Sequence, residues 1–180
     1  MSLEFIAEIT ANATDTQDLI FTTIPQTYES LRIIGVGNGQ ASISAGLNCV
    51  FSLVFNQDTS GSKHAWQRTA ADYNSQVTNV EGIFNGNYAQ AGYFTGSAPD
   101  SGYYPANYIT DIYNYKGVAA TGDVQYFSQS TAATYNNNYS FNSYTSGTYN
   151  NGTTPITSLQ LNCGGANWMR YTKFSLYGRD

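Results

Sequence analysis

The sequence predicts an all-β protein with little helix, folded as a single domain over residues 1–180. Strand-like segments, short and rich in β-branched and aromatic residues, recur between clusters of Gly, Asn, Asp and Pro. No stretch of the chain carries a sustained apolar stripe at helical spacing. A chain of 180 residues also has the usual length of one domain, long enough to build a core without disulfides or metal.

Five segments carry the strongest strand signals. In Leu47–Phe55, apolar residues fill one face and Val50 and Val54 lie on the other, which predicts a strand in the middle of a sheet. The other four are Leu19–Ile24, Leu31–Val36, Ile156–Leu161 and Thr172–Tyr177. The side chains predicted to form the core are Leu47, Phe51, Leu53, Phe55, Leu161, Phe174 and Leu176.

Three features suggest more than one structure. Ser62–Asn74 is the only segment that could be a helix, although it lacks the apolar stripe. Gly35–Gly39 superficially resembles a phosphate-binding loop, but it lacks the third glycine at the required spacing, the following helix and the P-loop lysine, so a hairpin turn is predicted. Cys49 and Cys163 lie in apolar segments and are expected to be buried thiols, unless their strands are neighbours that allow a disulfide.

Composition and charge exclude several classes of function. The chain has 7 basic and 12 acidic residues, which argues against nucleic-acid binding, and its 15% aromatic content argues against disorder. The N-terminal MSLEFIAEIT has no basic cluster and no long apolar run, so no signal peptide and no membrane association are expected.

The segment Gly82–Thr154 differs from the rest of the chain. It holds four charged residues but twelve of the sixteen tyrosines, together with many Asn, Ser, Thr and Gly. This is the composition of protein contact surfaces, because tyrosine offers a large rigid ring at low entropic cost. It also suits long loops and edge strands of a sandwich whose tyrosines cover the core, and both interpretations stay open. The predicted interface residues are Tyr103, Tyr104, Tyr108, Tyr113 and Tyr115.

The search for catalytic residues predicts that the protein is not an enzyme. His64 is the only histidine, and it follows a run of turn-forming residues, so a surface or loop position is expected. Asp58 in that run is expected to form an Asx-turn rather than a Ca²⁺ site. No catalytic residue, metal or cofactor is predicted. Four carboxylates could still converge as a glycosidase pair, although nothing in the sequence brings two together: Glu81, Asp100, Asp111 and Asp123.

Three stretches go beyond composition: Ile20–Gly35 contains I-P-Q-T-Y between two strands, Phe55–Ser62 contains an F-N-x-D turn, and Ile156–Leu161 with Phe174–Gly178 supplies an I-T-S strand and a closing F-x-L-Y-G strand. In matching order, these stretches resemble the opening, the F-N-G-D turn and the closing hairpin of a family of tailed-bacteriophage virion proteins. The resemblance implies an antiparallel β-sandwich of jelly-roll type with long Tyr/Asn/Ser/Gly-rich loops. It does not cover the tyrosine-rich middle.

The resemblance implies a non-enzymatic structural protein of the phage particle. A capsid decoration or head-surface subunit is expected, because only about seventeen residues precede the first matched strand and leave no room for an attachment shaft. The alternative is a tail, baseplate or fibre-tip module that binds host-surface glycans. The expected partners are other virion proteins, a major capsid or tail protein, and further copies of the chain, with a trimer as the symmetric form. The protein is expected to be made in the bacterial cytoplasm and to reside in the virion.

Overall fold

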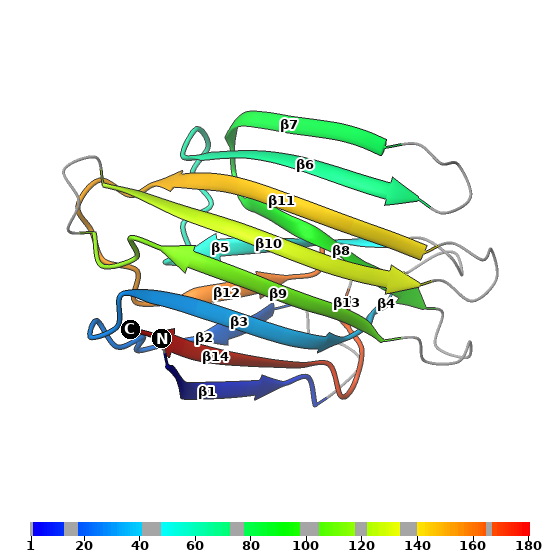
Figure 1. Ribbon diagram of the computed structural model, residues 1–180, viewed down its shortest axis with the longest axis horizontal. Helices are drawn as coiled ribbons and strands as arrows, with labels where there is room; N and C mark the ends of the chain where they lie inside the picture. The colour runs from blue at the N-terminus through cyan, green and yellow to red at the C-terminus, as the bar shows by residue number, and fades with distance from the viewer. Residues whose placement is uncertain are drawn as a thin grey trace.

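The computed structural model shows two β-sheets packed face to face, with no helix among the described residues (Figure 1). The structure describes residues 2–12, 18–40, 48–72, 78–97, 105–117, 122–133, 140–164 and 167–180. In these ranges no helix is long and apolar enough to cross a membrane. The predicted all-β sandwich is confirmed.

The larger sheet has eight strands and the smaller has six. In spatial order, the larger sheet consists of β1 (Leu3–Thr10), β14 (Lys173–Arg179), β3 (Ser30–Gly37), β9 (Ala106–Tyr113), β10 (Asp123–Ala133), β11 (Ser140–Asn150), β6 (His64–Asp72) and β7 (Thr78–Gly86). The smaller consists of β13 (Asn167–Trp168), β4 (Gly39–Gln40), β8 (Ala89–Ser97), β5 (Asn48–Phe55), β12 (Leu159–Asn162) and β2 (Asp18–Phe21). Among the described residues, the strands pair antiparallel except at the short parallel β4–β8 bridge.

The core lies between the sheets and follows from strand alternation. β5 pairs with β8 and β12 in the middle of the smaller sheet, as predicted, and points Phe51, Leu53 and Phe55 inward. Its Phe51 ring stacks against Phe174 of β14, with centroids 5.6 Å apart. Six of the seven predicted core residues are fully buried, and Leu47 lies outside the described residues. Cys163 is also buried, just after β12, while the side chain of Cys49 is not described.

The described part of the tyrosine-rich segment consists mainly of long strands, and its connections at 98–104, 118–121 and 134–139 lie outside the described residues. It supplies β8 to β11, and β9, β10 and β11 lie in sequence order in the interior of the larger sheet (Figure 1). Their strand signal in the sequence is weak, because hydroxyl-bearing and aromatic residues are mixed on both faces and no face is continuously apolar, as one face of β5 is.

The inward hydroxyls of β10 bind the backbone of β8 across the sandwich. The Tyr126 hydroxyl donates to the Gln90 carbonyl at 2.8 Å, and Ser128 Oγ donates to the Ala91 carbonyl at 2.5 Å. Ser130 Oγ accepts from the Tyr93 amide at 3.1 Å. The register of β8 against β5 shifts by one residue beside these contacts. Polar side chains between the sheets thus satisfy backbone groups next to this irregularity.

Ser62–Asn74, the only segment that could be a helix, contains strand β6 instead, which pairs with β11 and β7 and agrees with the expectation of little helix. One local prediction is wrong. Gly35–Gly39 is not a hairpin turn, because the chain leaves the larger sheet at the end of β3 and enters the smaller as β4. The glycines permit close approach instead: a Cβ on Gly35 would lie 2.4 Å from the Phe174 ring.

The segments that carry the phage-protein resemblance contact one another at one end of the sandwich. Gln26 Nε2 donates to the Ile156 carbonyl at 2.9 Å, which joins the I-P-Q-T-Y stretch to the I-T-S stretch. Asn56 Oδ1 accepts from the Thr157 amide at 2.8 Å. A Cβ on Gly178 would overlap the Tyr28 ring, so this ring lies directly on the last strand. These segments, which are far apart in the chain, therefore pack against one another in the fold.

Candidate functional site

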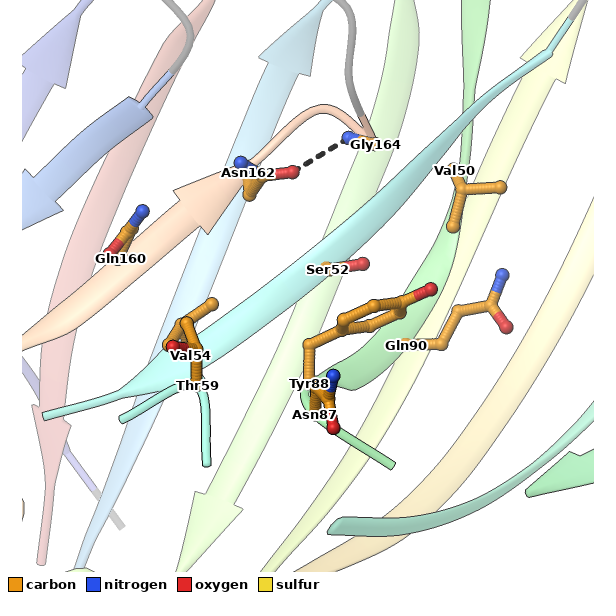
Figure 2. Close-up of a pocket in the computed structure, with 10 residues that line it drawn as sticks. All are labelled: Val50, Ser52, Val54, Thr59, Asn87, Tyr88, Gln90, Gln160, Asn162 and Gly164. Carbon is orange, nitrogen blue, oxygen red and sulfur yellow. Dashed lines mark hydrogen bonds between the residues drawn. The ribbon is translucent and has the colours of Figure 1, made fainter. Parts of the chain in front are cut away.

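A groove of about 480 Å³ lies on the outer face of the smaller sheet (Figure 2). Figure 2 shows Ser52 near its centre, with Gln90 on one side and Gln160 and Asn162 on the other. Ten residues line it: Val50, Ser52, Val54, Thr59, Asn87, Tyr88, Gln90, Gln160, Asn162 and Gly164. This volume falls within the range of about 300–1,000 Å³ that is usual for small-molecule sites.

Strand alternation sets the floor of the groove. Since odd-numbered residues of β5 point into the core, Val50, Ser52 and Val54 point outward. In the same way, Gln160 and Asn162 of β12 lie opposite the buried Leu159 and Leu161. Ser52 and Gln90 are only 3% and 5% exposed, so the floor lies well below the surrounding surface.

Asn162 is held in one orientation at the edge of the groove. Its Nδ2 donates to Asp18 Oδ1 at 2.7 Å, and its Oδ1 accepts from the Gly164 amide at 2.8 Å (Figure 2). Gly164 has φ +48°, and a Cβ there would lie 2.7 Å from the Val50 carbonyl. Glycine therefore lets the chain after β12 approach β5 closely.

The loop that carries Thr59 is fixed by Asp58. Its Oδ1 accepts from the Ser60 amide at 2.9 Å, and its Oδ2 accepts from Lys63 Nζ at 2.5 Å and from the Tyr149 hydroxyl at 2.9 Å. The predicted Asx-turn is thus confirmed. Hydrogen bonds from Lys63 and Ser60 hold the pKa of Asp58 well below its usual range. The carboxylate is therefore used to support the wall of the groove.

The groove offers binding groups but no acid–base chemistry. None of its ten described lining residues is an acid, a base or a thiol. It presents amides and hydroxyls, which both donate and accept hydrogen bonds, beside the ring of Tyr88 and two valines. Such a surface can bind an uncharged polar ligand without reacting with it. The described residues also contain no group of three His, Cys, Asp or Glu side chains close enough to hold a metal ion.

His64 is buried, which corrects the prediction of a surface or loop histidine. It begins β6 and is 1% exposed, with its ring stacked on Tyr149 at a centroid distance of 4.6 Å. Its Nδ1 lies 3.2 Å from the Gly86 carbonyl. Burial lowers its pKa below the ordinary value. The turn-forming residues before it do form a loop, but the strand that follows begins at His64 itself and turns the ring into the core.

Of the five predicted interface tyrosines, two are buried, one is exposed and two lie outside the described residues. Tyr108 and Tyr115 are wrong as interface residues, because both side chains are fully buried inside the sandwich. Tyr108 packs its ring against Phe51 at 4.2 Å, and the Tyr115 hydroxyl donates to the Pro25 carbonyl at 2.7 Å. Tyr113 is 42% exposed on the outer face of β9. Tyr103 and Tyr104 lie outside the described residues.

The outer face of β9, β10 and β11 carries an exposed apolar patch that composition alone did not locate. Four large side chains, each 42–48% exposed, form this β9–β11 face: Ile109, Tyr113, Phe127 and Tyr144. The Phe127 and Tyr144 rings stack at 6.5 Å, and Gln129 pairs across strands with both Ile109 and Tyr144. Their alternation with buried residues on the same strands is the signal that reveals the face.

The one charged side chain in the middle of this face is neutralised. Asp111 lies directly opposite Phe127, and its two oxygens accept from Arg32 Nε and Nη2, each at 2.7 Å. Arg179 Nη1 lies 3.3 Å from the same carboxylate. Asp111 is therefore an ion-pair partner. The structure does not pair it with another predicted carboxylate among the described residues: Asp111 binds arginine and not Asp123, and Asp100 and the side chain of Glu81 lie outside the described residues.

The sequence matches no family model, and no curated protein is significantly similar to it.

Proposed function

We propose that this chain is a non-enzymatic structural subunit of a bacteriophage particle, a capsid decoration or head-surface protein that attaches through its β9–β11 face. The resemblance of three ordered segments to phage virion proteins supports the class of function. These segments also contact one another at one end of the sandwich, so the residues that carry the resemblance belong to one part of the fold.

The observation that carries the proposal is the exposed apolar patch on the β9–β11 face. A sheet face that exposes several large apolar side chains favours an interaction surface, because water contact with them is unfavourable. Protein interfaces are depleted of charge at their centre, and here Asp111 already has both of its oxygens bound to arginine. A partner can therefore cover the patch without desolvating an unpaired charge.

The most direct test replaces Phe127 with glutamate. The new carboxylate would lie opposite Asp111 at the centre of the patch, so association through this face should weaken at least about tenfold, which corresponds to about 1.4 kcal/mol. Sedimentation velocity of the purified protein measures self-association, and the amount of protein retained on purified phage particles measures attachment to the virion.

Tyr88→Ala is the matched control, because it removes an aromatic side chain that is 45% exposed and lies just before β8 of the other sheet. It should leave both measurements unchanged. If Phe127→Glu also leaves both unchanged while the protein stays folded, the β9–β11 face is not the attachment surface.

Copy number per particle distinguishes the two locations. A head-surface subunit should be present in hundreds of copies, whereas three, six or twelve copies would place the chain in the tail, baseplate or fibre tip. Quantitative mass spectrometry of purified particles gives this number. Absence of the chain from particles would refute the virion assignment itself.

A further inference from the structure

We infer that the groove on the outer face of the smaller sheet is a binding site for a neutral carbohydrate chain. The inference concerns a different face from the β9–β11 face and does not depend on the virion assignment. It depends on the charge, the shape and the rigidity of the groove.

The lining excludes charged ligands as the preferred class. The ten lining residues carry no formal charge, and the carboxylates of Asp18 and Asp58 beside them are already bound, Asp18 to Asn162 and Asp58 to Lys63 and Ser60. An anionic or cationic ligand would lose hydration in this groove without gaining an ion pair. A neutral ligand does not have that cost.

The mixture of groups fits sugars in particular. A sugar ring has hydroxyls around its edge and C–H groups on its faces. The four amide side chains Asn87, Gln90, Gln160 and Asn162 can donate and accept toward the hydroxyls. Tyr88, which is 45% exposed, and the two valines offer apolar surface to the C–H faces. Figure 2 shows the Tyr88 ring extending over the groove between Ser52 and Gln90.

The groove is also preorganised. Asn162 is bound at both ends of its amide, and Thr59 is the middle residue of the Asx-turn that Asp58 anchors. Gln90 belongs to the part of β8 that Tyr126 binds through the backbone. Groups that are already fixed lose little conformational freedom when a ligand binds. This matters for carbohydrates, because each hydroxyl contact gives only a small net gain over water.

The experiment is a binding screen of the purified protein against defined probes. They are hexasaccharides of glucose, mannose, galactose and N-acetylglucosamine, a neutral bacterial O-antigen polysaccharide, and oligogalacturonate as the acidic comparison. We expect at least one neutral probe to bind and oligogalacturonate not to bind. Isothermal titration calorimetry then measures the affinity for the neutral probe.

Two groove variants and one matched control localise the binding. Tyr88→Ala and Gln160→Ala should each weaken the affinity at least about fivefold, since each removes a contact group without disturbing the core. Tyr144→Ala removes an equally exposed tyrosine from the other sheet and should leave the affinity unchanged.

Three results would overturn the inference: no neutral probe binds, the acidic probe binds as well as the neutral ones, or both groove variants bind like the unaltered protein. Circular dichroism of each variant checks that the fold is kept. Because attachment to particles is measured separately with Phe127→Glu, a failure of carbohydrate binding would leave the proposed structural role standing, and the reverse also holds.

Discussion

Replacing Tyr126 with phenylalanine tests whether hydroxyls of the larger sheet stabilise the backbone of the smaller one. The substitution keeps the ring, which is 3% exposed and lies 6.3 Å from that of Phe55, and removes only the donor to the Gln90 carbonyl at 2.8 Å. A buried hydrogen bond contributes about 1 kcal/mol net, and a buried acceptor left without its donor adds a desolvation cost, so the free energy of unfolding should fall by about 1–3 kcal/mol.

Equilibrium urea denaturation measures this change. With a slope of about 2 kcal/mol per molar urea, the midpoint should move by about 0.5–1.5 M while the slope stays constant. Tyr113→Phe is the control, because its hydroxyl is on an exposed side chain, and it should change stability by less than about 0.5 kcal/mol. If Tyr126→Phe is as mild as the control, the hydroxyl contacts to β8 do not stabilise the sandwich.

Three further predictions concern the core, the buried histidine and the ion pair. Leu53 is fully buried, so Leu53→Ala should cost roughly 2–5 kcal/mol in urea denaturation, and a cost below about 1 kcal/mol would contradict the core assignment. Burial lowers the pKa of His64 from its ordinary 6.5, so below that pH the unfolded chain binds a proton that the folded chain does not. The free energy of unfolding should therefore fall from pH 7 toward pH 5, and His64→Gln should flatten this dependence; an unchanged slope would rule out His64 as its source. Asp111→Ala should cost about 1 kcal/mol at low salt and less at high salt, because the pairs with Arg32 and Arg179 are partly exposed; a cost independent of salt would show that the effect is not ionic.

Local sequence patterns were sufficient to predict the strands that are rich in aliphatic residues. The five predicted strands overlap β2, β3, β5, β12 and β14, because continuous runs of Leu, Ile, Val and Phe next to turn residues have few other ways to bury their surface. The central place of β5 followed from apolar residues on both of its faces. The Asx-turn at Asp58 was also predictable, since it involves residues only two positions apart.

Tertiary structure alone decided which face of the polar strands is buried. On β9, Tyr108 and Tyr113 have the same chemistry, yet one packs on Phe51 and the other meets solvent, because alternation and pairing with β10 assign them to opposite faces. His64 is buried for the same reason, in spite of the turn residues that precede it.

The groove shows the same division between sequence and structure. Its polar residues come from β5, β8, β12 and two loops, which are far apart in the chain and become neighbours only through pairing of β12 with β5 and of β5 with β8. Uncharged amides have no distinctive spacing in a sequence this rich in Asn and Gln, so no motif marks them. The sequence determined that the outward residues of β5 include Ser52, because the period of a strand is two. Only long-range strand pairing could surround that serine with four amides and a tyrosine, since such contacts depend on which distant segments share a sheet edge.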